Sequence, residues 1–244
     1  MKKFLRGILS GFCFTIFGLG GIITGSIIIP VLLIFCKKSQ QRKTLSFTIH
    51  ILWRAFVSLM RGLKLIDIKC SDSKKLRKIR GKIVIANHPS LIDVVILVAR
   101  IPNSICVVKE SLFHNIFIRA IIRRVYVSNS MNAEKFVRQA SEILDAGYNI
   151  IIFPEGTRTI PGKPVHFHRG FAYLQIESKH DILPIHIENT PKILGKNQAW
   201  WDVGDKTSVY TLTLRPLIHF AKNEKLTNRQ TALDITKKAQ KAIF

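Results

Sequence analysis

Apolar and polar positions alternate in blocks along most of the chain, and the blocks predict alternating strands and helices. Short apolar runs typical of buried strands lie at 82–86, 104–108, 124–128 and 148–153. Helices are predicted at 94–99, 112–122 and 132–144, with Gly147 as a C-cap. Later segments continue the alternation with a helix at 171–177, strands at 181–188 and 207–214, and a helix at 229–243. This order predicts an α/β domain built on a largely parallel sheet flanked by helices.

The first third of the chain has a different pattern. No charged residue occurs in 7–36, and these thirty mostly apolar residues exceed the roughly 20 that span a bilayer. The run either crosses the membrane or enters and leaves one leaflet, since a cleaved signal would have a shorter apolar core. A helix at 44–63 is predicted to lie at the interface with Trp53 at headgroup depth, the alternative being a core helix. We therefore predict membrane-anchoring helices at 1–63 and a folded domain at 64–244, joined by a solvated or headgroup-facing basic link at 64–80.

The charge supports a membrane-facing N-terminal third. The chain carries 38 Lys and Arg against 15 Asp and Glu, a net charge of +23, and residues 1–80 hold +14 of it. Such a distribution favours an anionic membrane surface, with an acidic carrier protein as a second partner. Nucleic acid is the rival interpretation, but no nucleic-acid module is recognisable. The four cysteines form no metal or redox spacing, so we expect reduced thiols.

A candidate catalytic pair lies in the stretch 87–93, between the strand at 82–86 and the following helix. Pro89 suits the first helical position, which would place Asp93 just past the first turn and within reach of His88. A neutral histidine beside a carboxylate can take a proton from a hydroxyl group, so the pair suggests activation of a substrate hydroxyl. Taken alone, two residues at this spacing more often indicate a histidine that only caps or packs and an aspartate on a solvated helix face.

A second stretch, 153–158, follows another predicted strand and supplies the resemblance to a family. Together, Asn87-His88-Pro89-Ser90-Leu91-Ile92-Asp93 and Phe153-Pro154-Glu155-Gly156-Thr157-Arg158 closely resemble the first and third motifs of the glycerolipid acyltransferases, which acylate lysophosphatidic acid and related acceptors. Ile182-Leu183-Pro184-Ile185 is similar to their fourth motif. The resemblance covers roughly residues 80–190 and implies an acyltransferase catalytic domain at 64–244. It implies His88 as the general base, Asp93 as its orienting residue, and direct attack on a thioester.

The resemblance also implies the substrates. The acyl donor is expected to be acyl-CoA or acyl carrier protein, with no other cofactor and no metal. Lysophosphatidic acid is the favoured acceptor, and the expected place is a membrane, such as a bacterial inner membrane, with the active site facing the cytoplasm. Other lysolipids, including amino-acid-containing ones, remain alternatives, as does a non-enzymatic protein that binds anionic lipid or a carrier protein.

The expected substrate-binding residues come from the second and third motifs. Arg158 offers a planar fork for a phosphate, and Glu155 is expected either to orient it or to bond the glycerol part. A structural turn held by a Glu–Arg pair is the alternative. Gly156 permits close backbone approach to a ligand. The remaining members of the set are Lys109, Arg123, Arg124 and Thr157.

The second motif departs from the family pattern, which puts the acceptor in doubt. The family has a Pro and a Gly after the segment at Lys109 and an Asp-Arg pair after the next strand, whereas Ser128-Asn129 stands here. Arg123 and Arg124 precede that strand and are candidate replacements. His166 and His168 are expected to line the acceptor site or the surface, because two histidines alone do not indicate a metal site.

Overall fold

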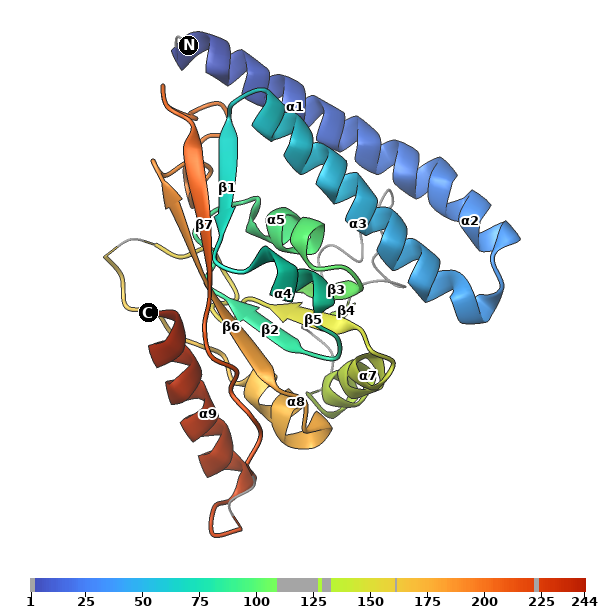
Figure 1. The fold of residues 1–244 in the computed structure, drawn as a ribbon, viewed down its shortest axis with the longest axis vertical. Coiled ribbons are helices and arrows are strands. Elements are labelled where there is room, and N and C mark those ends of the chain that lie inside the picture. The colour runs from blue at the N-terminus through green and yellow to red at the C-terminus, as the bar shows by residue number, and fades with distance from the viewer. Residues whose placement is uncertain (1–2, 109–126, 129–132, 161, 222–223) are drawn as a thin grey trace.

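The computed structural model describes residues 3–108, 127–128, 133–160, 162–221 and 224–244 (Figure 1). This part of the chain forms a seven-stranded sheet in the order β1-β7-β6-β2-β5-β3-β4. The strands are β1 (Ile66–Cys70), β2 (Ile83–Ala86), β3 (Ser104–Val108), β4 (Val127–Ser128), β5 (Asn149–Ile152), β6 (Ile182–Thr190) and β7 (Ser208–Leu214). Every pairing is parallel except that of β6 with β7, so the expected α/β fold with a largely parallel sheet is confirmed.

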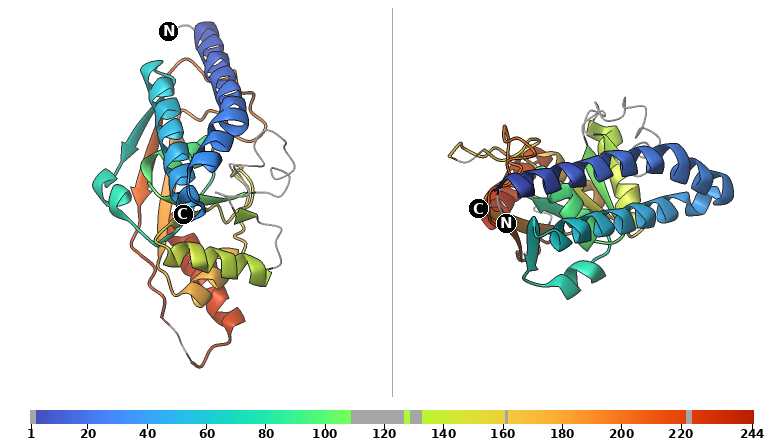
Figure 2. Two further views of the ribbon diagram at one scale, coloured as in Figure 1. Left: turned by 90° about the vertical axis from the view of Figure 1, so that its right-hand side faces the viewer. Right: turned by 90° about the horizontal axis from the view of Figure 1, so that it is seen from above.

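Helices cover both faces of the sheet (Figures 1 and 2). They are α1 (Lys3–Ile23), the π-helical turn η1 (Thr24–Ile28), α2 (Ile29–Phe35), α3 (Lys38–Gly62), α4 (Ser73–Lys78), α5 (Asp93–Arg100), α7 (Ala133–Asp145), α8 (Gly170–Ser178) and α9 (Asn228–Ile243). The hydrophobic core on one face contains residues of α1, α3 and α5, and the core on the other face contains residues of α7, α8 and α9.

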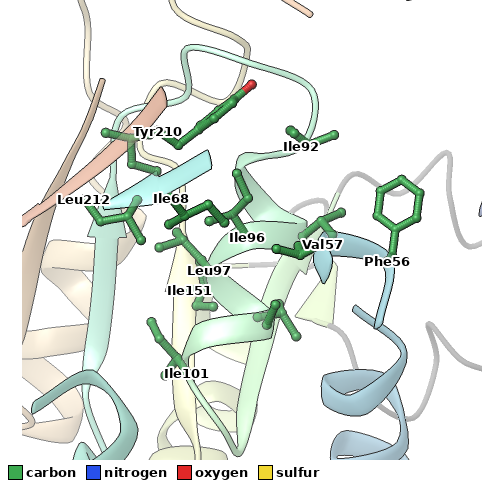
Figure 3. Close-up of a cluster of buried hydrophobic side chains, with 14 of the residues drawn as sticks. Phe56, Val57, Ile68, Ile92, Ile96, Leu97, Ile101, Ile151, Tyr210 and Leu212 are labelled. Carbon is green, nitrogen blue, oxygen red and sulfur yellow. The ribbon is translucent and has the colours of Figure 1, made fainter. Parts of the chain in front are cut away.

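The central strand β2 explains why the sheet is covered twice. Its alternate residues Val84 and Ala86 belong to the core under α3 and α5, whereas Ile83 and Ile85 belong to the core under α8 and α9. A strand buried on both faces is apolar at every position rather than at every second one, which is the pattern read from the sequence. Figure 3 shows the first of these cores, with Ile96 and Leu97 of α5 packed toward the sheet.

The expected basic link at 64–80 is wrong. Ile66 and Ile68 are buried in β1, which pairs with β7 at the edge of the sheet, and α4 follows with Leu76 buried. Asp72 caps α4 by accepting a hydrogen bond from the Lys75 backbone N–H. Because the strand is short and its flanks are basic, its two buried isoleucines give a weak pattern, and only the distant partner β7 makes it a strand.

The predicted helix at 94–99 is present as α5, but the helical position suggested for Pro89 is not. The helix begins at Asp93 rather than at Pro89, so Asp93 lies in its first turn rather than past it. The reason is that the Asp93 carboxylate accepts hydrogen bonds from the backbone and hydroxyl of Ser90, which shapes a turn before the helix. Residues 89–92 therefore form a tight connection between β2 and α5.

The N-terminal helices lie along the sheet's α5 face. The continuous helical segment Lys3–Phe35 has 33 residues and a mean hydropathy of 2.3 in its most apolar window. Within the described residues it is the one helix long and apolar enough to cross a membrane, by length and composition alone. The helix α3 runs back beside it (Figure 1) and buries Leu45, Ile49 and Met60. The helix predicted at 44–63 therefore begins earlier, and one of its faces belongs to the core.

Arg6 fastens α1 to the rest of the molecule. Its side chain is 2% exposed. The guanidinium donates hydrogen bonds of 2.7–3.3 Å to four backbone carbonyls, those of Lys64, Leu65, Gly204 and Lys206. Burial removes the water around a guanidinium, which costs free energy unless other hydrogen bonds replace those to water. The four carbonyl acceptors provide these replacements. The first turns of α1 are thus fixed to the two segments that precede β1 and β7.

We expect Arg6→Ala to destabilise the protein, because four carbonyls lose a charged donor. A loss of about 3 kcal/mol, the upper value for one charge-assisted hydrogen bond, would lower Tm by about 6–12 °C for a chain of this size. Thermal unfolding of the detergent-solubilised protein measures it. Arg42→Ala, which removes the same side chain from an exposed position of α3, is the control. Equal melting temperatures for the two variants would contradict the role of Arg6.

Candidate active site

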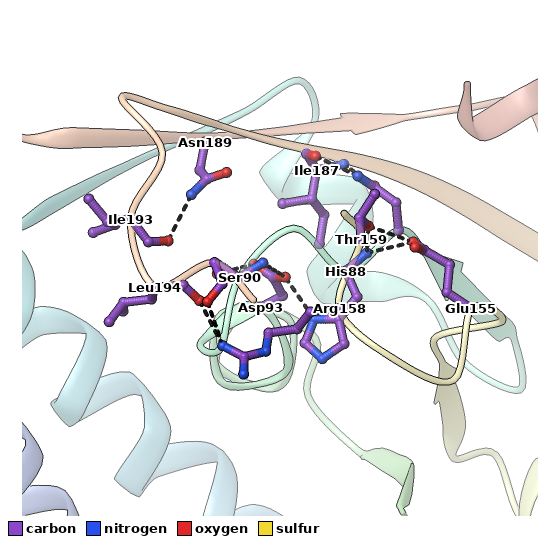
Figure 4. Close-up of polar contacts among 12 residues, drawn as sticks. His88, Ser90, Asp93, Glu155, Arg158, Thr159, Ile187, Asn189, Ile193 and Leu194 are labelled. Carbon is purple, nitrogen blue, oxygen red and sulfur yellow. Dashed lines mark hydrogen bonds and ion pairs between the residues drawn. The ribbon is translucent and has the colours of Figure 1, made fainter. Parts of the chain in front are cut away.

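The two sequence motifs meet because β2 and β5 are neighbours. The strands are parallel, with Ile85 opposite Ile152, so their carboxyl ends lie at the same edge of the sheet. His88 follows β2 and Glu155 follows β5 at this edge (Figure 4). Asn87 extends the edge by exchanging two side-chain hydrogen bonds with the Ile187 backbone of β6, at 2.8 and 2.7 Å. Three strands therefore hold the site.

The predicted histidine–carboxylate contact is present. His88 Nδ1 lies 2.8 Å from Asp93 Oδ2, and the side chains are 20% and 0% exposed. Because Asp93 presents only oxygen acceptors when ionised, Nδ1 is the protonated nitrogen and Nε2 carries the free lone pair. Within the described residues, no hydrogen bond of Nε2 is recorded. The imidazole stacks on the Phe153 ring at a centroid distance of 4.3 Å, which fixes its plane.

Asp93 is held by more than the histidine. Its Oδ2 accepts a hydrogen bond of 2.7 Å from the Ser90 backbone N–H, and its Oδ1 accepts one of 2.5 Å from the Ser90 hydroxyl. Burial raises the pKa of the Asp93 carboxyl, and the hydrogen bonds and charge of His88, together with Ser90, act in the opposite direction. Three donors on two buried oxygens leave the carboxylate one orientation, and this orientation fixes the imidazole.

Tyr210 of β7 lies behind this pair and was not expected from the sequence. Its side chain is fully buried, and its hydroxyl is close to Ser90, Asn189 and the Asp93 charge. Burial first, and then the Asp93 charge, raise the pKa of Tyr210, so the phenol stays neutral.

Glu155 supports the backbone of His88 instead of orienting Arg158. Its Oε1 accepts hydrogen bonds of 3.0 Å from the His88 N–H and 2.7 Å from the Thr159 hydroxyl. Thr159 in turn donates its backbone N–H to the His88 carbonyl at 2.8 Å. Among the described residues no ion pair joins Glu155 to Arg158, so neither an orienting contact nor a Glu–Arg turn is present, and a bond from Glu155 to the glycerol part stays a prediction. Hydrogen bonds to the His88 backbone therefore join the stretch 87–93 to the segment that follows β5.

Arg158 reaches a loop that the sequence did not single out. Its Nη1 donates to the carbonyls of Leu194 and Gly195, at 3.2 and 2.8 Å (Figure 4). The Leu194 carbonyl also accepts the Leu91 N–H at 2.9 Å, so this loop closes over the first motif. No partner of Nε or Nη2 is recorded in the described part of the chain. Nη1 is therefore engaged within the protein, and in the described residues Nε and Nη2 are not.

Gly156 and Thr157 form the outer turn of the stretch 153–158, and both are exposed. Gly156 has a φ of +64°, which favours glycine, and an added Cβ would lie 3.2 Å from the His168 ring. The close approach that this glycine permits is therefore to His168, which the sequence had placed at the acceptor site or the surface. His166 and His168 are both exposed, and no group of three or more potential metal-ligating side chains occurs in the part of the chain that the structure describes.

Three of the expected binding residues, Lys109, Arg123 and Arg124, lie outside the described residues. Of the residues that the sequence reasoning missed, Ser90 had a local signal, since a serine three residues before an aspartate often forms such a turn. Thr159 directly follows the stretch 153–158 and gave no separate signal. Tyr210 and the Leu194–Gly195 carbonyls are distant in sequence and are brought to the site by β6 and β7.

Comparison with known proteins agrees with this arrangement. A family model described as "Acyltransferase" matches residues 67–188. A 1-acyl-sn-glycerol-3-phosphate acyltransferase of Cocos nucifera is 29% identical over 122 residues, which are 47% of this chain and 40% of that protein. The Limnanthes douglasii enzyme of the same name is 29% identical over 51% of this chain and 46% of its own length. The chain thus spans less than half the length of these plant relatives.

Two bacterial proteins are matched over more of their length. A 1-acyl-sn-glycerol-3-phosphate acyltransferase of Borreliella burgdorferi is 26% identical over 181 residues, 70% of each chain. The crystal structure of the 1-acyl-sn-glycerophosphate acyltransferase PlsC from Thermotoga maritima superimposes with a TM-score of 0.71 at 20% identity, covering 98% of this chain and 97% of that one. The two proteins therefore share their fold. Because the family model covers half of the 244 residues and includes both motifs of the site, the chain belongs to the acyltransferase family.

Proposed function

We propose that this protein is a membrane-bound O-acyltransferase that moves a fatty acyl group from acyl-CoA or acyl carrier protein to lysophosphatidic acid, giving phosphatidic acid. The observation that carries the proposal is the His88–Asp93 pair, whose Nε2 is free and whose Nδ1 is fixed on a fully buried carboxylate. The names of the plant and bacterial relatives support the acceptor class.

The proposed reaction needs no acyl-enzyme. His88 Nε2 takes the proton of the acceptor hydroxyl as that oxygen attacks the thioester carbonyl carbon. The tetrahedral intermediate collapses with cleavage of the C–S bond, and the imidazolium returns the proton to the leaving thiolate. Asp93 stabilises the imidazolium in between and holds the tautomer that leaves Nε2 unprotonated at the start. A new ester and a free thiol result, so atoms and charge balance.

Arg158 is the proposed contact to the acceptor phosphate. Its Nη1 is engaged by the Leu194 and Gly195 carbonyls, which holds the guanidinium in place, while its other donors are available to an anion. Because these contacts already give Arg158 a structural role that needs no phosphate, a second candidate is the same reaction on a lysolipid without a terminal phosphate. Glu155 acts in both cases by fixing the His88 backbone.

The membrane is the proposed location. The segment Lys3–Phe35 is long and apolar enough to cross a bilayer, and many of its large apolar side chains are exposed. We further propose that residues 1–63 anchor the domain at 64–244 to a bacterial inner membrane, with the site facing the cytoplasm. Both parts share one hydrophobic core through α3 and α5, so the anchor is also a structural part of the domain.

The first prediction tests the base. His88→Ala should reduce turnover by about 10²–10⁴, the range for loss of general-base catalysis, without loss of folding. Release of free thiol from acyl-CoA in the presence of lysophosphatidic acid measures it. His219→Ala is a matched control, because His219 also bonds an aspartate, Asp181, at 3.0 Å but on the surface. Near-normal turnover of His88→Ala would exclude His88 from the mechanism.

The second prediction tests phosphate recognition. Arg158→Lys should raise the apparent KM for lysophosphatidic acid about tenfold to a hundredfold and leave that for the acyl donor nearly unchanged, because an ammonium lacks the planar fork. The same substitution also removes the hydrogen bonds to the Leu194 and Gly195 carbonyls, and the resulting disturbance of that loop would affect turnover with any acceptor. A phosphate-free monoacylglycerol acceptor therefore separates the two effects. Equal losses on both acceptors would rule out phosphate binding by Arg158, and Arg229→Lys on exposed α9 serves as control.

The third prediction uses the pKa of Glu155, which burial raises against the opposing hydrogen bonds of Thr159 and His88. A carboxyl whose pKa is higher in the folded state favours folding when protonated, and this contribution is lost as pH rises through the folded-state pKa. Glutamine keeps an acceptor oxygen without the charge. Glu155→Gln should therefore raise Tm at pH values above the folded-state pKa, and the gain should shrink below the unfolded-state pKa of about 4.3.

Thermal unfolding across this pH range measures the effect, with exposed Glu188→Gln as control. A lower melting temperature of Glu155→Gln at neutral pH would show that the ionised carboxylate stabilises the site.

A further inference from the structure

A second concave site lies on the α3 face of the molecule, away from the catalytic candidates. A pocket of about 390 Å³ is formed between α3, α4 and the end of α5. Its lining includes four arginines, Arg54 and Arg61 of α3, Arg77 of α4 and Arg100 of α5. At about 30 Å³ for each water in the liquid, the pocket has room for roughly a dozen waters, which is enough for a phosphate with its attached glycerol.

The positive charge of this arginine pocket is poorly balanced within the described residues. Arg61 bonds the Asp67 carboxylate at 2.9 Å, whereas no ion pair of Arg54, Arg77 or Arg100 is recorded there. Burial lowers the pKa of Arg100, and the charges of the three other guanidiniums lower it further. Four like charges around one concavity repel each other, so an anion in the pocket would relieve the repulsion.

The arginine pocket is separate from the active site. Asp93 is the first residue of α5 and Arg100 the last, which places them about 10 Å apart along the helix axis. Pro102, also in the lining, precedes β3 at the amino end of the strand, whereas His88 follows the carboxyl end of β2. The pocket thus opens at the opposite end of the parallel strands.

An apolar stripe leads to the pocket along α3. Phe47 and Ile51 are 59% and 43% exposed. Arg54, Ser58 and Arg61 follow at spacings of three or four residues, so all five positions share one face of the helix. The neighbouring α1–α2 segment also exposes large apolar side chains, among them Ile34 and Phe35 at its end. A ligand that suits this surface has an anionic group joined to an apolar tail.

We propose that the arginine pocket binds the headgroup phosphate of an anionic phospholipid of the membrane, with the acyl chains directed along the apolar stripe of α3. The proposal depends on the proposed membrane location but not on acyl transfer at His88. Arginine forks bind phosphate oxygens in pairs, and Ser58 adds a hydroxyl to the lining.

A bound headgroup would connect α3, α4 and α5, because each contributes an arginine. His50, which also lines the pocket, already joins α3 to α5 through a contact of 2.7 Å between its Nδ1 and the Val98 carbonyl. The lipid would therefore stabilise the packing of α5, the helix whose first residue is Asp93, and should raise the melting temperature of the protein.

The test is calorimetric titration of the full-length protein in a zwitterionic detergent. The probes are dihexanoyl phosphatidylglycerol, inorganic phosphate and coenzyme A. The pocket variant Arg54→Lys/Arg100→Lys keeps the charge but loses two planar forks, and Arg77→Lys is a second, exposed variant in case the first fails to fold. Arg138→Lys/Arg229→Lys makes the same change at exposed positions of α7 and α9.

We expect the lipid probe to bind the parent protein and the α7/α9 control equally, and to raise the melting temperature of both. Affinity should fall at least about tenfold in the pocket variant, because an ammonium cannot replace a bidentate contact. Arg77→Lys should weaken binding in the same direction. His88→Ala should bind the lipid as the parent does, which separates failure of this proposal from failure of the catalytic one.

Unchanged affinity in both the pocket variant and Arg77→Lys would overturn the proposal, since general charge attraction would then explain the binding. Inorganic phosphate binding as tightly as the lipid would overturn the phospholipid as the source of the phosphate. If coenzyme A bound the parent protein but not the pocket variant, and the lipid bound neither, the pocket would be assigned to the acyl donor instead.

Discussion

The parallel pairing of β2 with β5 is the constraint on which the rest of this structure depends. Parallel neighbours end at the same edge, and the residues just beyond Ala86 and Ile152 therefore come together although they are far apart in sequence. The hydrogen bond from the His88 N–H to Glu155 is the direct result. β2 is buried on both faces, so its side chains pack into both hydrophobic cores and place the site between them.

A second constraint is the burial of Asp93. A carboxylate removed from water is tolerated only when its oxygens are satisfied, and Ser90 and His88 provide the donors. These same bonds explain why α5 begins at Asp93. The hydrogen bonds that stabilise the turn before α5 thus also orient the imidazole, so the structural and the proposed catalytic roles of Asp93 depend on the same carboxylate.

The N-terminal helices contribute to the domain as well as to the proposed anchor. Arg6 bonds backbone carbonyls beside β1 and β7, and α3 packs on α5. The face of α3 that the core does not use carries apolar side chains at one end and the arginine pocket at the other. The proposed attachment and the proposed catalysis therefore share elements, and α5 lies between the proposed lipid site and the proposed base.

The sequence by itself determined the α/β class, most strands and helices, and the two motifs with His88, Asp93, Glu155 and Arg158. These features are local, because apolar runs, helical spacing and motif residues are read within a few positions. Only the tertiary structure decided what depends on distant partners. β1 is a strand because β7 lies beside it, and Tyr210 reaches the site because β7 pairs antiparallel with β6. Glu155 bonds His88 rather than Arg158, and Arg158 bonds the Leu194 and Gly195 carbonyls, because the orientation of a side chain is set by neighbours that no local pattern specifies.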